Sequence, residues 1–139
     1  MYLVPSIGEL RRHKSYLHRL TAVQASALMS TAMSSEIARK WLLPMVLEMA
    51  SDNVSRSYSK YTYIILKLMV KCFIQVPNIR FNVAKALEKM APVCGKTVSD
   101  EQIRPVLSVL AEDSDRDVRF FACKSLEAIE KEFGTMKHS

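Results

Sequence analysis

Few side chains in this sequence could carry covalent or metal chemistry, and their spacing does not bring them together. They are three cysteines and three histidines, at Cys72, Cys94, Cys123, His13, His18 and His138. The cysteines form no CxxC pair and the histidines show no ligand spacing with them, so no metal site is expected. The sequence also contains no Gly-rich loop, paired carboxylate site or Ser/His/Asp arrangement. We therefore expect no cofactor, no small-molecule substrate and no enzymatic activity.

The cysteines also bear on the cellular compartment. An odd number of cysteines without a framework spacing is typical of a reducing environment, which here means the cytoplasm or the nucleus. Without a neighbouring base, Cys94 and Cys123 are expected to be small buried apolar residues rather than nucleophiles.

One segment, residues 54–75, contains both the basic excess and the longest apolar run of the chain. The whole sequence has 20 basic and 14 acidic residues; four of the basic residues and none of the acidic ones lie in this segment. The remaining 16 basic and 14 acidic residues are nearly balanced, so the net charge of +6 does not by itself predict nucleic-acid binding. The apolar run, 64–74, is interrupted by Lys67 and Lys71 and is too short to cross a bilayer, so no membrane span is expected.

Two kinds of residue recur at regular intervals and indicate an internal repeat. They are Pro5, Pro44 and Pro105, and Arg19, Arg80 and Arg119. The interval from Pro5 to Pro44 equals the interval from Arg80 to Arg119. The interval from Pro44 to Pro105 equals the interval from Arg19 to Arg80. The longer interval exceeds the shorter by the same amount in both series. A 39-residue period interrupted once, between Pro44 and Arg80, explains both series.

Alignment of the units places the inserted block at 54–75, or equally at 55–76, because Val54 and Val76 are interchangeable. The length of this block accounts for the excess in the longer intervals. With the block removed, the chain is predicted to be one domain of three units. Their expected bounds are 1–34, 35–95 including the insertion, and 96–134.

Each unit is predicted to consist of two antiparallel helices joined by a short turn. In the third unit, Ser99 and Asp100 are expected to cap the first helix, and its apolar residues recur at helical spacing. The expected core residues of this unit are Ile103, Val106, Leu107 and Leu110, followed by Val118, Phe121, Ala122, Leu126 and Ile129. Gly95 and Gly134 are expected to end the second helices of units two and three, and a turn is expected at Ser15 and Tyr16.

Pairs of helices with a 39-residue period fall in the size range of HEAT-type repeats. Such pairs cannot bury their apolar faces alone, so they stack. The predicted fold class is therefore all-α: a right-handed HEAT-repeat solenoid of three two-helix repeats with one 22-residue insertion.

Several stretches also resemble a known family. Pro followed eight residues later by Asp, as in Pro44/Asp52 and Pro105/Asp113, with Val-Arg opening the second helix, is the HEAT pattern. More narrowly, "KSYLHRLT", "LLPMVLEMASDN", "PNIRFNVAKALEKMAPV" and "IRPVLSVLAEDSDRDVRFFACKSL" resemble the last repeats of the scaffold (A) regulatory subunit of protein phosphatase 2A. The resemblance covers residues 3 to about 130 apart from the insertion.

This resemblance implies a non-catalytic scaffold whose terminal repeats hold the phosphatase catalytic subunit through the turns within each repeat. Other regulatory subunits of the phosphatase are further candidate partners; nucleic acid is not. The partner-binding residues that it implies are Tyr16, Leu17, Arg19, Pro77, Asn78, Arg80, Asp115 and Arg116.

Each of these side chains also has a purely structural interpretation. Tyr16 could anchor an interface or pack on its own helix, and the first is favoured because aromatic residues are enriched in interface cores. Arg80 and Arg119 are expected to pair with aspartates of the same or a neighbouring turn, the candidates being Asp52, Asp113 and Asp117. His13 replaces the aspartate in the first unit, so Arg19 is expected to be the arginine most available to another protein.

The insertion admits two explanations. It contains no Ala, Gly, Pro, Asp or Glu, and Val-Ser at its start and Phe-Ile-Gln at its end can be encoded by intron donor and acceptor sequences. We favour a translated, unspliced intron. The competing explanation is a real surface loop, since long insertions cost little loop entropy. With that loop the alternative function is a HEAT-type adaptor in transport or nucleic-acid assemblies, bound through the basic segment.

Overall fold

The computed structural model of the chain describes residues 3–50 and 77–134. The predictions for the insertion at 54–75, for Asp52, for Cys72 and for His138 concern residues outside these ranges. The described helices are α1 (Leu3–Leu10), α2 (Tyr16–Ala32), α3 (Ser35–Ile37), α4 (Leu43–Ala50), α6 (Pro77–Cys94), α7 (Lys96–Val98), α8 (Arg104–Leu110) and α9 (Arg116–Phe133). Two π-helical turns, η1 (Ala38–Leu42) and η2 (Ser99–Ile103), join α3 to α4 and α7 to α8.

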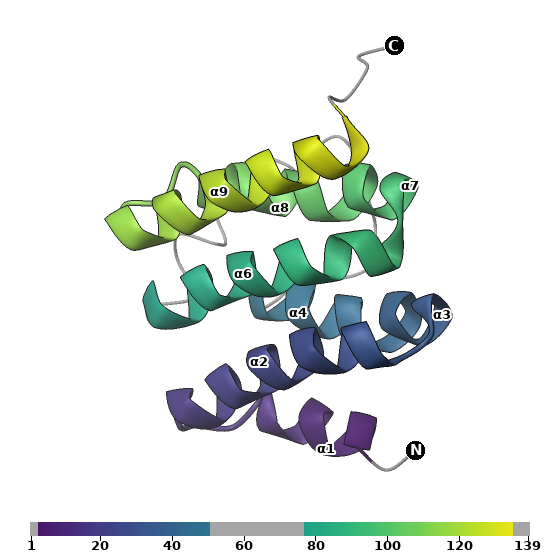
Figure 1. The fold of residues 1–139 in the computed structure, drawn as a ribbon. Helices are drawn as coiled ribbons and strands as arrows, with labels where there is room; N and C mark the ends of the chain where they lie inside the picture. The colour runs from purple at the N-terminus through teal and green to yellow at the C-terminus, as the bar shows by residue number, and fades with distance from the viewer. Residues whose placement is uncertain (1–2, 51–76, 135–139) are drawn as a thin grey trace.

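The described part of the chain is entirely helical, which confirms the predicted all-α class. Three long helices, α2, α6 and α9, lie side by side, with α6 between the other two (Figure 1). Each of the shorter helices α1, α4 and α8 precedes and contacts one of the long helices; α4 and α8 lie behind them and α1 lies below α2 in Figure 1. Within these ranges no helix is long and apolar enough to cross a membrane.

The helices recur at the intervals seen in the sequence. The starts of α2 and α6 are separated by the longer interval, the one between Arg19 and Arg80. The same longer interval separates the starts of α3, η1 and α4 from those of α7, η2 and α8 respectively. The starts of α6 and α9 are separated by the shorter interval, and these two helices have the same length, 18 residues each. The intervals between the helix starts are therefore the same as the intervals between the prolines and between the arginines.

The expected ends of the second helices are confirmed. Gly95 and Gly134 follow α6 and α9 with φ of +86° and +78°, a backbone conformation that a residue with a Cβ adopts only with strain. At the first turn, α2 begins at Tyr16, so Ser15 lies in the predicted turn but Tyr16 is already the first residue of the helix.

Prolines explain the two π-helical turns, which the sequence analysis did not foresee. Pro44 and Pro105 are each the second residue after such a turn. A proline ring clashes with the carbonyl four residues earlier in a regular α-helix. In both turns the bonding shifts to five residues: Leu43 N–H donates to Ala38 O, and Arg104 N–H donates to Ser99 O. The wider turn gives the ring room.

The predicted capping of the third unit is wrong. Its first helical turn begins at Lys96, after Gly95, so Ser99 and Asp100 lie inside the helical segment instead of at its start. Ser99 is fully buried, and its hydroxyl donates to the carbonyl of Ala91 at 3.1 Å. The serine therefore joins two helices rather than capping one.

The core follows the predicted pattern. Every apolar residue expected in the core of the third unit is buried or packs against the buried cluster. Ala22, Ala84 and Ala122 have no exposed surface, so the long helices can approach closely where these small residues lie. Cys94 is buried as expected, but Cys123 is exposed, which corrects the prediction for that residue.

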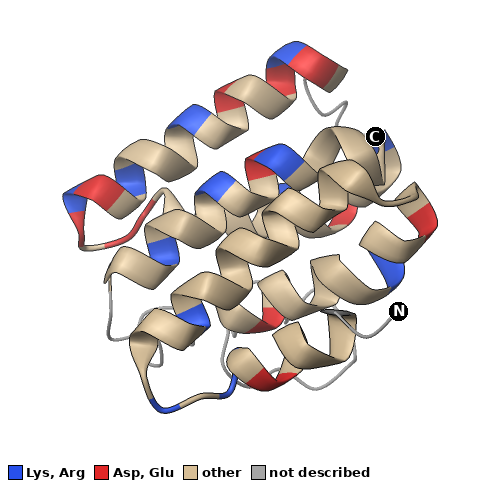
Figure 2. Cartoon of the chain, turned by 60° about the horizontal axis from the view of Figure 1, so that its bottom comes forward, with Lys and Arg blue, Asp and Glu red and all other residues tan. Residues whose placement is uncertain are grey.

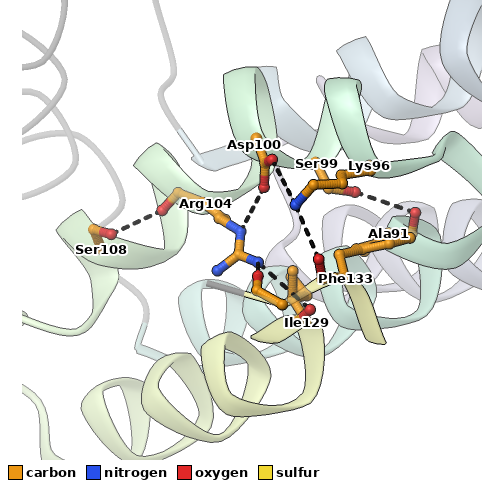
Figure 3. A network of polar contacts seen from close by, with 9 residues as sticks. Ala91, Lys96, Ser99, Asp100, Arg104, Ser108, Ile129 and Phe133 are labelled. Carbon is orange, nitrogen blue, oxygen red and sulfur yellow. Dashed lines mark hydrogen bonds and ion pairs between the residues drawn. The ribbon is translucent and has the colours of Figure 1, made fainter. Parts of the chain in front are cut away.

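A polar network fixes the carboxyl end of α9 (Figure 3). Lys96 Nζ donates to Phe133 O at 2.9 Å, and the guanidinium of Arg104 donates to Gly134 O at 2.7 Å. Asp100 lies between these cations, 3.2 Å from Lys96 Nζ and 2.7 Å from Arg104 Nε. The last carbonyls of a helix have no partners within the helix, and here two cations supply them.

Candidate functional site

The predicted partner-binding residues lie along one side of the molecule. We call this side the turn edge: residues 11–19 around the α1–α2 turn, 77–81 at the start of α6, and 111–119 around the α8–α9 turn. The amino-terminal ends of α2, α6 and α9 all point to this side, on the left in Figure 1. The parallel stacking of these three helices therefore brings together residues up to about 100 positions apart in the sequence.

Arg19 holds the first turn together. Its Nη1 donates to the carbonyls of His13 at 2.8 Å and Lys14 at 2.9 Å. The turn is closed further by the N–H of Ser15, which donates to His13 Nδ1 at 3.1 Å, and the His13 ring stacks on that of His18. Arg19 is half-buried and its local partner is the backbone. The expectation that it is the arginine most available to another protein is therefore not supported.

Arg119 closes the last turn in the same way as Arg19 closes the first. Its Nη1 donates to the carbonyls of Asp113 and Ser114, both at 2.8 Å. An aspartate was the expected partner of Arg119, but within the described residues its partners are these carbonyl oxygens. Asp115 then caps α9, its carboxylate accepting the N–H groups of Asp117 at 3.0 Å and Val118 at 3.1 Å.

Arg80 forms the predicted arginine–aspartate pair. Its Nη2 donates to Asp113 Oδ1 at 2.9 Å, and its Nε lies 2.9 Å from Oδ2 of the same carboxylate. Both side chains are buried, and Asp113 also accepts the N–H of Asp115 at 2.9 Å. The start of α6 is thus tied to the α8–α9 turn through a two-point contact that suits the planar guanidinium.

Two apolar side chains of the first turn face solvent. Tyr16 is 42% exposed and Leu17 is 56% exposed, although both are large hydrophobic residues. Packing on its own helix, the alternative weighed for Tyr16, leaves a large part of this side chain exposed. An exposed aromatic residue beside an exposed leucine, on a turn held rigid by Arg19, has the character of an interface anchor.

The remaining predicted site residues differ in how accessible they are. Pro77 and Arg116 are exposed at the starts of α6 and α9. Asn78 and Asp115 are half-buried, and Asn78 Oδ1 accepts a hydrogen bond from Asn82 at 3.0 Å. Arg80 is buried. Only some of the eight residues could therefore touch a partner directly, and the others hold the edge in shape.

The sequence analysis missed Phe120, which is 61% exposed on α9. The doublet Phe120-Phe121 contained the signal. Successive helical residues point about 100° apart, so only one ring of a doublet can face the core. Phe121 packs against Phe81 of α6 with ring centroids 5.4 Å apart, and Phe120 is left outside.

The two described turns carry opposite charges. Figure 2 shows Lys and Arg at the α1–α2 turn, where Arg11, Arg12 and Lys14 lie, and acidic residues at the α8–α9 turn. Glu48 of α4 forms ion pairs with Arg11 and, at 3.5 Å, with Arg12. Lys14 remains exposed beside Tyr16 and Leu17. Among the described residues no group of three or more His, Cys, Asp or Glu side chains could hold a metal ion.

Comparison with characterised proteins identifies relatives of the chain, although no family model matches it. The Drosophila melanogaster serine/threonine-protein phosphatase PP2A 65 kDa regulatory subunit is 44% identical over 54 residues, 39% of this chain and 9% of that protein. The PP2A regulatory A subunit of Schizosaccharomyces pombe is 33% identical over 91 residues, 66% and 12% respectively. Its Saccharomyces cerevisiae counterpart is 28% identical over 124 residues, 85% and 16% respectively.

These similarities make the chain a homologue of a regulatory subunit of a serine/threonine phosphatase. Its relatives are the 65 kDa regulatory A subunits of protein phosphatase 2A in animals and their yeast counterparts, which confirms the resemblance noted in the sequence. The chain matches 9 to 16% of the length of these relatives.

Proposed function

We propose that this chain is a non-catalytic scaffold segment that binds the catalytic subunit of protein phosphatase 2A through its turn edge. The carrying observation is the exposure of Tyr16 and Leu17 on a turn whose backbone Arg19 holds. A rigid turn loses little conformational entropy when a partner binds, and buried aromatic anchors contribute most to such interfaces. The choice of the phosphatase as the partner comes from the relatives, which are named as its regulatory subunits.

The proposal includes an architecture. We assign the described helices to three HEAT-type repeats with the bounds predicted from the sequence, and residues 54–75 to an insertion between the helices of the second. The matching intervals between helix starts support this assignment. We also assign the chain to the cytoplasm or the nucleus, because an odd number of cysteines without a framework spacing suits a reducing compartment.

The proposed roles divide into contact and support. Tyr16, Leu17 and Arg116 would contact the catalytic subunit, since their side chains are accessible. Arg19 and Arg80 would act indirectly, by holding the turns that present those side chains. Other regulatory subunits of the phosphatase are further partners that the homology suggests.

The test is direct binding of the purified catalytic subunit to the chain by biolayer interferometry. Tyr16→Ala and Leu17→Ala are each expected to weaken binding by about tenfold, the effect of removing one interface anchor. Leu28→Ala is the matched control, because Leu28 is a 69% exposed leucine of the same helix at a distance from the turn. Equal binding of all three variants would contradict the proposed edge.

A second comparison addresses the insertion. The catalytic subunit is measured against the full chain and against a chain lacking residues 54–75. Binding by the shortened chain alone would support the scaffold role and an insertion that obstructs the turn. Binding by both would support a tolerated loop. If neither binds at about 10 μM, the scaffold proposal fails for this segment.

A further inference from the structure

The outer face of α9 repeats the surface on which α9 itself packs. That surface belongs to α6 and includes Arg80, Phe81, Lys85 and Glu88. At the 39-residue interval α9 carries Arg119, Phe120, Lys124 and Glu127. All four positions keep the same residue type.

On α6 this set of residues is occupied. Asp113 binds the guanidinium of Arg80, and the Phe121 ring stacks on Phe81. Lys85 Nζ lies 5.0 Å from the centroid of the same Phe121 ring, in a cation–π contact. The Ser125 hydroxyl lies 3.1 Å from Oε2 of Glu88. The α6 face therefore recognises a carboxylate in a turn, an aromatic ring eight residues later and a hydroxyl four residues after that.

On α9 the same set of residues is open. Phe120, Lys124 and Glu127 are exposed, and with Arg116, Arg119 and Ala111 they line a shallow hollow. Arg119 uses Nη1 for the carbonyls of its own turn, and no carboxylate within residues 3–50 and 77–134 pairs with it. Arg80 binds Asp113 through Nε and Nη2, and within the described residues these two atoms of Arg119 bind no carboxylate. The hollow itself is lined by three cations and one carboxylate, which makes it basic beside the acidic α8–α9 turn.

A second copy of the chain does not fit this hollow. The end that a second copy could offer in a continued stack is α2 with its preceding turn. One hundred residues before Asp113, Phe121 and Ser125, this end carries His13, Thr21 and Ala25. It therefore has no carboxylate for Arg119 and no ring for Phe120. Its turn also contains Arg11, Arg12 and Lys14, which would oppose the basic hollow.

We propose that the outer face of α9 binds a helical element of another protein, one that presents an aspartate in a turn and an aromatic ring eight residues further on. The aspartate pairs with Arg119, and the ring stacks on Phe120 beneath Lys124. Each of these contacts has its counterpart between α9 and α6. This surface lies on the solvent-facing side of α9; it shares Arg116 with the turn edge and does not include Tyr16 or Leu17.

The probe is a synthetic peptide with the sequence of residues 112–131, acetylated, amidated and held helical by a Glu127–Lys131 lactam. It carries Asp113, Phe121 and Ser125, the chemistry that the α6 face already binds. Titration into the ¹⁵N-labelled full chain, followed by NMR, is expected to shift the amide signals of Phe120, Cys123, Lys124 and Glu127. Phe120→Ala in the chain should weaken binding by about tenfold and Asp113→Asn in the peptide by about fivefold.

Leu28→Ala in the chain is the control and should leave the peptide affinity unchanged, and circular dichroism verifies that both chain variants remain folded. Three results would overturn the proposal. One is no shift at about 1 mM peptide. Another is shifts at Phe81 and Lys85 instead, which would mean that the peptide displaces α9 from α6. The last is equal binding by the Phe120→Ala variant.

Discussion

The α1–α2 turn and the α8–α9 turn have the same backbone design and opposite charge. In each, an arginine six residues after the first carbonyl donates through Nη1 to two successive carbonyl oxygens. The first turn carries Arg11, Arg12 and Lys14, whereas the last carries Glu112, Asp113 and Asp115. The geometry of the turn is therefore set by the arginine and is independent of the charges around it.

The two turns differ in how they are tied to the neighbouring layer. Asp113 of the last turn is buried against Arg80 of α6, whereas His13, at the equivalent place, is exposed and stacks on His18 of its own helix. The last turn is thus joined to the next layer through a buried ion pair, whereas the first turn is joined to α4 through the less buried pairs of Arg11 and Arg12 with Glu48. Tyr16 and Leu17 of the first turn remain exposed.

The largest expected difference follows from Asp113→Ala. Removing the carboxylate takes away both contacts that Asp113 makes with the buried Arg80 guanidinium and the acceptor for the N–H of Asp115, so we expect the free energy of unfolding to fall by about 3–5 kcal/mol. His13→Ala, the matched change in the first turn, should cost less than about 1 kcal/mol. Urea unfolding followed by circular dichroism measures both.

A double variant sharpens that result. In Arg80→Met/Asp113→Leu both charges are replaced by apolar groups, and much of the lost stability should return. Equal destabilisation by Asp113→Ala and His13→Ala would show that the buried pair does not distinguish the turns.

The next effect should be the same in both turns. A lysine cannot reproduce the planar fork of arginine, so Arg19→Lys and Arg119→Lys should each lower the free energy of unfolding by about 1 kcal/mol. Urea unfolding of the two single variants tests the shared design. A loss in one variant and none in the other would mean that the turns only look alike.

Removal of the helix-capping side chain should again lower the free energy of unfolding more in one turn than in the other, but by a smaller amount. Asp115 accepts two backbone N–H groups at the start of α9, whereas the Ser15 side chain makes no capping bond at the start of α2. Asp115→Ala should therefore cost about 1 kcal/mol and Ser15→Ala less than about 0.5 kcal/mol. Thermal unfolding of the two variants gives the comparison, which fails if Ser15→Ala is the more destabilising.

The smallest effect concerns the cysteines, of which Cys94 is the last residue of α6 and Cys123 lies in the middle of α9. Burial raises the pKa of the Cys94 thiol, and the nearby Arg39 opposes this rise only in part. The folded chain therefore holds this proton more tightly than the unfolded chain. The resulting stabilisation is complete below the ordinary thiol pKa and is lost as the pH rises through the folded value.

Alkylation by iodoacetamide, located by peptide mass spectrometry, should modify the exposed Cys123 and spare Cys94 at neutral pH. Unfolding in urea should become easier at alkaline pH in the wild type and less so in Cys94→Ala. Rapid alkylation of Cys94 in the folded chain would contradict its burial. The same assay on Asp113→Ala shows whether damage at the turn edge reaches the opposite end of α6.

Periodicity predicted most of the described fold. The spacing of the prolines and arginines located the helices, and Gly95 and Gly134 marked where two of them end. The π-helical turns could not be predicted, because they result from a conflict between a proline ring and a carbonyl oxygen that composition does not reveal. Ser99 was misjudged for a related reason: a serine before an acidic residue is typical of a helix start, yet this hydroxyl bonds to Ala91 across two helices.

The candidate site was predictable in position and less so in role. An aspartate partner for Arg80 was predicted from the sequence, with Asp113 as one of three candidates, and the structure shows that pair. The partners of Arg19 and Arg119 are carbonyl oxygens, which every residue possesses, so no side-chain pattern identifies them. Phe120 was missed since its neighbour Phe121 satisfied the core pattern alone.

The two ends of α9 are fastened differently from its middle, and this has a mechanical consequence. Near its amino end the Arg80–Asp113 pair links the turn to α6, and at its carboxyl end Arg104 and Lys96 grip the last carbonyl oxygens. A pulling force applied at the carboxyl end would therefore load these short polar links in shear before it reached the apolar contacts between the helices. At the carboxyl end these links run to α7 and α8, whereas the Arg80–Asp113 pair at the other end runs to α6.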